Sequence, residues 1–170
     1  MAVITASEGR ITLKADFHPE LAIQARRCRG RFVGKETGWS FLPEHEPAIR
    51  QICQTLYGVD GTPDAWHDCC TVQVEVDEQD VRAPLWRQFN ADIYLGGRHV
   101  VGVFGPRQAV RTGRGIKFLR GQPHCATRIG AYHMEVPTGS ILEIRKYPRA
   151  ALAFLSRCLD GHGSWRMAQG

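Results

Sequence analysis

The first 58 residues carry the clearest alternation of apolar and polar positions in the chain. Residues 11–17 alternate with a period of two, which predicts a half-buried strand. Pro19 suits the first turn of a helix, because the N–H that it lacks has no partner there. Leu21, Ala25 and Cys28 then recur at helical spacing on one face. We therefore expect a strand followed by a short helix.

Two short apolar segments, residues 31–33 and 39–42, follow this helix. A polar loop bracketed by two glycines separates them, and this pattern predicts a hairpin. Residues 47–57 then carry apolar side chains at the i, i+3, i+4 and i+7 spacing of an amphipathic helix. Residues 10–58 are therefore expected to form a β-α-β-β-α module.

The second half of the chain is rich in short β segments. Residues 59–64 concentrate turn-forming residues and mark the best candidate boundary. One helical turn is expected at residues 84–89, and a final helix from Pro148 to Cys158. The strands expected here span residues 71–76, 91–95, 99–104, 116–119, 132–136 and 141–145.

These elements predict an α+β protein. A small N-terminal β-α-β-β-α module is followed by a β-rich antiparallel sheet or partial barrel with a C-terminal helix. We expect the module at residues 1–59, a linker at 60–70, the β-rich basic domain with its helix at 71–160, and a loose tail at 161–170.

The composition is that of an ordinary globular protein, with 170 residues of which 43% are apolar and 23% charged. Its apolar runs are far shorter than the roughly 20 residues of a membrane helix. The first ten residues lack the basic start and long apolar core of a secretory signal. We therefore expect a cytoplasmic protein without a membrane partner.

Charge is arranged in blocks, which is more informative than the net charge of +5. Residues 60–80 hold seven Asp and Glu and no Lys or Arg. Residues 81–128 hold nine Lys and Arg, and Asp92 is their only acid. This basic block favours an anionic partner.

Two basic clusters are the candidate binding sites. One is a glycine-rich loop between strands, where guanidinium groups and backbone N–H groups can bind phosphates without sequence specificity; a solvated hairpin is the alternative. The other lies at a helix end, where cations also suit the helix dipole. The candidate nucleic-acid-binding residues are Arg26, Arg27, Arg29, Arg31, Lys35, Arg107, Arg111, Arg114, Lys117 and Arg120.

The cysteines and histidines give weaker signals. Without a secretory signal, the six cysteines are expected to be thiols. The His and Cys residues lack paired zinc-ligand spacing, so we expect neither a metal nor a cofactor. His124 beside Cys125 is the remaining enzymatic alternative, but no third group orients the pair and no catalytic residue is assigned. Trp39 is expected in the core, with base stacking as the alternative.

The N-terminal module resembles the HARP domain, which occurs in annealing helicases and in stand-alone modules of bacteria and their mobile elements. The residues that carry the resemblance are Phe17, Pro19, Glu20, Leu21, Gly30, Arg31, Phe32, Trp39 and Phe41. The resemblance covers about the first third of the chain and implies binding to single-stranded or branched nucleic acid. A G-x-x-x-x-G-K-[ST] phosphate loop is missing from the sequence, so ATP-driven activity is not implied.

Two functions are consistent with these patterns. The first is a non-enzymatic nucleic-acid-binding protein that prefers single-stranded or branched DNA, or RNA, through its basic surfaces. The alternative is a mobile-element interaction protein or inhibitor that docks on a host nucleoprotein or nuclease complex. The acidic segment beside the basic block is compatible with this alternative.

Overall fold

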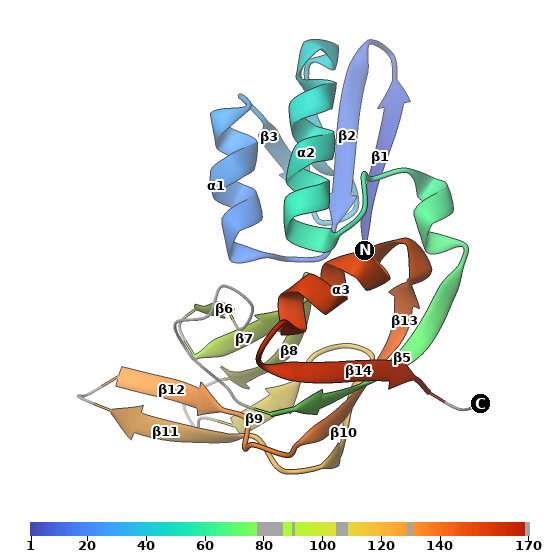
Figure 1. Cartoon of the computed structure of the whole chain (residues 1–170). Helices are drawn as coiled ribbons and strands as arrows, with labels where there is room; N and C mark the ends of the chain where they lie inside the picture. Colours follow the sequence, from blue (N-terminus) through green and yellow to red (C-terminus); the bar gives the residue numbers. More distant parts are fainter. Residues whose placement is uncertain (78–86, 90, 105–108, 129–130, 169–170) are drawn as a thin grey trace.

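The structure is a computed structural model, which describes residues 1–77, 87–89, 91–104, 109–128 and 131–168. Its fold is α+β with several antiparallel sheets, as the sequence predicts. The N-terminal module lies at one end of the molecule and the β-rich half at the other, with the C-terminal helix α3 (Leu152–Leu159) between them (Figure 1).

The N-terminal module contains a four-stranded antiparallel sheet with the strand order β1-β2-β4-β3. The expected strand and hairpin are confirmed, but β1 was not expected. Ala2, Val3 and Ile4 are all apolar, so this segment has no clean period of two. The strands are β1 (Ala2–Ser7), β2 (Arg10–Ala15), β3 (Arg31–Gly34) and β4 (Gly38–Phe41).

Two helices pack against this sheet and bury its apolar side chains. They are α1 (Pro19–Arg27) and α2 (Glu46–Tyr57), which follows the short 3-10 turn η1 (Pro43–His45). The imidazole of His18 caps α1, because its Nδ1 accepts a hydrogen bond from the backbone N–H of Glu20 at 3.3 Å. Gly58 ends α2 in the left-handed conformation, as glycine commonly does.

Among its described residues, the β-rich half has two four-stranded sheets and one hairpin, and these sheets are open rather than closed into a barrel. The first sheet has the order β10-β13-β5-β14, and the second β6-β7-β8-β9. A 3-10 turn, η3 (Arg149–Ala151), leads into α3. The strands are β5 (Cys69–Val76), β6 (Arg87–Phe89), β7 (Asp92–Leu95), β8 (Arg98–Phe104), β9 (Ala109–Thr112), β10 (Ile116–Arg120), β11 (His124–Arg128), β12 (Ala131–Glu135), β13 (Ile141–Pro148) and β14 (Gly163–Met167).

The expectation of a loose tail after residue 160 is wrong. Strand β14 pairs with β5 from Gly163 to Met167, and the indole Nε1 of Trp165 donates to Ser156 Oγ at 2.9 Å. The helical turn expected at residues 84–89 is also wrong for Arg87–Phe89, which form β6, while 84–86 lie outside the described residues. Both segments become strands because they pair with strands elsewhere in the fold, and the local sequence pattern does not reveal this pairing.

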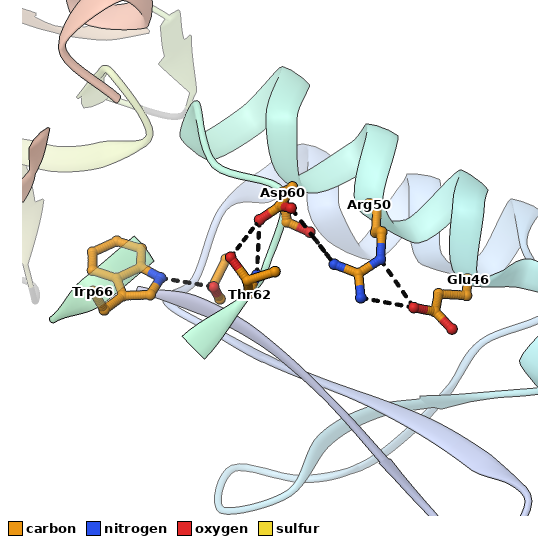
Figure 2. A network of polar contacts seen from close by, with 6 residues as sticks. Glu46, Arg50, Asp60, Thr62 and Trp66 are labelled. Carbon is orange, nitrogen blue, oxygen red and sulfur yellow. Dashed lines mark hydrogen bonds and ion pairs between the residues drawn. The ribbon is translucent and has the colours of Figure 1, made fainter. Parts of the chain in front are cut away.

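The expected linker is a packed connection (Figure 2). It contains the 3-10 turn η2 (Pro63–Trp66), and Trp66 Nε1 donates to the carbonyl oxygen of Ala2 at 2.8 Å. The carboxylate of Asp60 accepts from the backbone N–H and hydroxyl of Thr62 at 2.9 and 2.8 Å, which lowers the pKa of Asp60.

Arg50 joins this connection to α2. Its guanidinium donates to Glu46 Oε1 at 2.7 Å on one side and to the carbonyl oxygen of Asp60 at 3.3 Å on the other. The start of the connection is therefore tied to the helix that precedes it (Figure 2).

The two halves meet in a close contact around His18. The imidazole lies edge-on to Tyr57 and Tyr94, with ring centroids 6.0 and 5.1 Å away. The Tyr57 hydroxyl donates to the carbonyl oxygen of Asp16 at 2.7 Å. Gly97, in the turn between β7 and β8, packs directly on the backbone at the end of α2, where a Cβ would overlap the carbonyl oxygen of Leu56.

We expect Gly97→Ala to destabilise the protein more than Gly9→Ala. Both glycines have a positive φ, +74° and +70°, so alanine carries a similar backbone strain at each. Only Gly97 lacks space for the added methyl group, so the extra loss in the free energy of unfolding should be about 1–3 kcal/mol. Urea unfolding of both variants measures this difference. Equal losses would show that the contact between the halves is looser than described.

Candidate nucleic-acid interface

Three adjoining hollows cross the face where the two halves meet. The first has a volume of about 550 Å³ and lies between α1 and the β3–β4 hairpin. The middle hollow, of about 400 Å³, lies between the end of β2 and strands β7 and β8. The third, of about 530 Å³, lies beside β13 and the segment between β9 and β10.

Shared residues connect these hollows into one surface, which we call the groove. Asp16 and Phe17 line both the first and the middle hollow. Asp16, Arg98 and Arg114 line both the middle and the third hollow. The described cations of the groove are Lys14, Arg26, Lys35, Arg98, Arg114, Arg145 and Lys146. Its described acids are Asp16 and Asp92.

The first hollow combines aromatic and basic side chains. Phe32 and Trp39 are cross-strand partners in the β3–β4 hairpin, and their ring centroids are 5.4 Å apart. Trp39 is only 9% exposed, which confirms that it belongs to the core, and Arg26 lies over its ring at 5.8 Å. Phe32 remains 53% exposed, so an aromatic face is available beside a guanidinium group.

The middle hollow contains a carboxylate held by an imidazole. Asp92 Oδ1 and His99 Nε2 are 3.0 Å apart on the neighbouring strands β7 and β8. Gly102 makes room for this pair, since a Cβ there would overlap Asp92 Oδ1. Phe104 is 46% exposed and packs edge-on to His99, and Arg111 lies over the Phe104 ring at 5.8 Å.

The third hollow is the most basic. The Arg98 guanidinium is held by the carbonyl oxygens of Arg114 and Lys146, at 3.1 and 3.4 Å. Arg145 and Lys146 are both exposed at a register shift in β13, where the ladder to β5 is interrupted. Arg145 also lies 3.8 Å from Glu143. The hollow therefore gathers guanidinium and ammonium groups from β8, β13 and the β9–β10 segment.

Three of the residues predicted from the sequence line this groove: Arg26 and Lys35 in the first hollow, and Arg114 in the other two. Arg111 adjoins it through Phe104. The remaining candidates are elsewhere. Four of them are exposed but outside the described lining: Arg27, Arg29, Arg31 and Lys117. Arg120 donates to Glu75 at 2.8 Å and to the Gly139 carbonyl oxygen at 2.7 Å. Arg107 lies outside the described residues.

Sequence reasoning missed several groove residues. Lys14 has a readable signal, because it occupies a polar position of the alternating β2 strand. Arg98 follows the Gly96-Gly97 turn, but its placement depends on how the β7–β8 hairpin docks against β13. Arg145 and Lys146 depend on the register shift in β13, which the sequence does not mark.

The cysteine-based enzymatic alternative gains no geometric support. His124 and Cys125 are successive residues of β11, so their side chains project to opposite faces of the strand. His124 Nε2 lies 3.2 Å from Glu135 Oε2 across the hairpin. Elsewhere, burial raises the pKa of Cys53 to about 12 and raises the pKa of Cys69, which disfavours the thiolate at both positions.

Among the residues that the structure describes, no group of three or more His, Cys, Asp or Glu side chains could hold a metal ion. The helices of the described part of the chain are all too short or too polar to cross a bilayer.

Comparison of the chain with protein-family models, with curated proteins and with solved structures finds no significant match.

We expect Tyr94→Phe to reduce the loss of stability at alkaline pH. An unperturbed tyrosine ionises near pH 10, whereas burial in the middle hollow raises the pKa of Tyr94 to about 12. Between these values the unfolded chain releases the proton and the folded protein keeps it, so the free energy of unfolding falls as pH rises above 10. The variant should avoid about 2 kcal/mol of this fall near pH 11.5.

Urea unfolding at pH about 8 and about 11.5 measures this effect. Tyr132→Phe, which changes an exposed tyrosine, is the matched control and should show the same alkaline loss as the unsubstituted protein. An equal loss in Tyr94→Phe would mean that Tyr94 is not shielded from water at the floor of the hollow.

Proposed function

We propose that this protein binds single-stranded or branched nucleic acid along the groove, without catalysing a reaction on it. The observation that carries this proposal is that the three hollows share lining residues and together present cations from both halves beside exposed phenylalanine rings. The resemblance of the first third of the chain to the HARP domain supports the same class of ligand.

The charge of the groove suits a phosphate backbone. Seven described cations against two acids would attract successive phosphates and release their counterions, which gives affinity without sequence specificity. The cations are spread over all three hollows rather than gathered at one point. This spacing fits an extended polyanion better than a small anionic ligand.

The aromatic residues favour single strands. Phe17 is 73% exposed at the boundary of two hollows, with Phe32 and Phe104 exposed on either side of it. Exposed rings can stack with unpaired bases, and each such contact is worth about 1–3 kcal/mol. In a duplex the bases are already stacked on one another, so these rings would contribute much less.

We expect the double substitution Lys35→Ala and Arg114→Ala to weaken binding of a short single-stranded oligonucleotide by about tenfold near 0.1 M salt. The two residues lie in the first and third hollows, so both ends of the groove lose a cation. The slope of log affinity against log salt should become shallower by about 1.4, or about 0.7 for each phosphate that is no longer neutralised. Fluorescence anisotropy over a salt series measures both quantities.

The matched control is the double substitution Arg27→Ala and Lys117→Ala. It removes the same charge from the same two halves, at exposed positions outside the described lining. If the affinity for the oligonucleotide falls by the same factor in both double variants, binding depends on overall charge and the groove is not the site. A salt-independent affinity would contradict the electrostatic proposal altogether.

We expect Phe17→Ala and Phe104→Ala each to weaken binding of a single strand by about fivefold or more, with little effect on a duplex of the same length. Phe17 is 73% exposed and Phe104 is 46% exposed, so neither substitution should greatly affect folding. Ile23→Ala, at an exposed apolar residue of α1, is the control. An equal effect on single strands and duplexes would exclude stacking as the basis of the preference.

The alternative, an interaction protein, predicts a different result when the protein is used to capture partners from a cell extract. A partner that remains bound to the protein after thorough nuclease treatment, while purified oligonucleotides fail to bind, would favour docking on a protein. Loss of all bound material after nuclease treatment would favour the groove as a nucleic-acid interface.

A further inference from the structure

The middle hollow holds a feature that phosphate binding leaves unexplained. Asp92 is the only acid among residues 81–128, which carry nine Lys and Arg, and its side chain lines the groove. A carboxylate repels phosphates, so it weakens a surface that binds only a backbone. Such a group is useful where the ligand presents a neutral hydrogen-bond donor.

We propose that the Asp92 carboxylate reads one nucleotide of the bound strand by accepting a hydrogen bond from a neutral donor on it. This inference rests on the proposed function of the groove. The donor chemistry is an amino group of a base or the 2′-hydroxyl of a ribose, both of which a carboxylate oxygen accepts.

The geometry holds the carboxylate ready for such a contact. His99 Nε2 lies 3.0 Å from Asp92 Oδ1 and fixes the orientation of the side chain. An ionised carboxylate offers about four lone-pair positions, so this bond uses only part of its capacity. The Asp92 side chain remains 30% exposed, which leaves it accessible from the hollow.

The surroundings of Asp92 suit a nucleotide. Phe17 and Phe104 provide exposed rings at the hollow, and Tyr94 is buried at its floor. Arg98 and Arg114 continue into the basic third hollow, where the flanking phosphates would lie. The volume of about 400 Å³ is within the range of small-ligand sites. The phenylalanine rings could thus stack on a base, the Asp92 carboxylate could accept from a donor group of the nucleotide, and the arginines could bind its phosphates.

Asp16, the other acid of the groove, is less suited to this role. Its carboxylate already accepts a hydrogen bond from the amino group of Met1, which neutralises much of its charge. It also lies at the junction of all three hollows rather than within one of them. Asp92 is therefore the acid that the experiment should change.

The experiment compares four unstructured homopolymers of equal length, made of deoxycytidine, deoxyuridine, cytidine and uridine. Cytosine carries an amino group where uracil has a carbonyl oxygen, and only the ribonucleotides carry the 2′-hydroxyl. Dissociation constants are measured at neutral pH for the unsubstituted protein and for Asp92→Asn. Asparagine keeps the shape and removes the charge.

If the donor is the amino group, the unsubstituted protein should bind both cytosine polymers about five- to tenfold more tightly than the uracil polymers. If the donor is the 2′-hydroxyl, it should bind both ribose polymers more tightly than the deoxyribose polymers by a similar factor. In either case Asp92→Asn should abolish this preference, because the amide keeps its oxygen on His99 and presents an NH2 donor where the carboxylate offered a free acceptor. Glu8→Gln, which removes an exposed carboxylate outside the described lining, should leave the ratio unchanged.

Two results would overturn the inference and leave the proposed function intact. One is equal binding of all four polymers by the unsubstituted protein, a result that does not depend on the folding of any variant. The other is a ratio that Asp92→Asn leaves unchanged while all four affinities rise together, which is the effect of charge alone. If none of the polymers binds, both the proposed function and this inference fail.

Discussion

The packing of the N-terminal module on the β-rich half is the constraint on which the groove depends. His18 is buried between the rings of Tyr57 and Tyr94, and Gly97 lies against the end of α2 with no space for a side chain. Because protein interiors are packed about as densely as organic crystals, such a contact fixes the position of the two halves relative to each other. The three hollows adjoin one another because this contact holds the end of β2, where Asp16 lines all three, beside strands β7 and β8.

The regular elements were largely predictable from the sequence, because apolar periodicity reports local burial. The helix from Pro19, the hairpin over 31–42 and six strands of the second half follow from that pattern, whereas β6, β9 and β11 were not predicted from it. Strand β14 was not predictable, since Gly163–Met167 become a strand only by pairing with β5, about ninety residues earlier. A local pattern cannot reveal a partner so distant in the chain.

The candidate site was predictable only in part, for the same reason. The basic clusters identified Arg26, Lys35 and Arg114, but they also included Arg120, which binds Glu75 and stabilises the sheet. Clustering in sequence detects charge and does not show whether a charge faces a ligand. Asp92 stands out in the sequence as an isolated acid. Its contact with His99 depends on the register of β7 with β8, which includes an irregularity.

The acidic segment at residues 60–80 has a structural explanation that bears on the choice between the two functions. The Asp60 carboxylate accepts from Thr62 and lies 3.8 Å from the Arg50 guanidinium. Asp68 lies 3.0 Å from Arg149 Nε, and Glu75 pairs with Arg120. Exposed pairs of this kind add little stability, but they place these carboxylates beside the molecule's own cations. Three of the five described acids of this segment are thus matched by cations of the fold. The groove keeps more cations than acids even when the pairs Lys14–Glu36 and Arg145–Glu143 are counted. That unbalanced positive surface favours a polyanionic ligand over a protein that would have to match both an acidic and a basic patch.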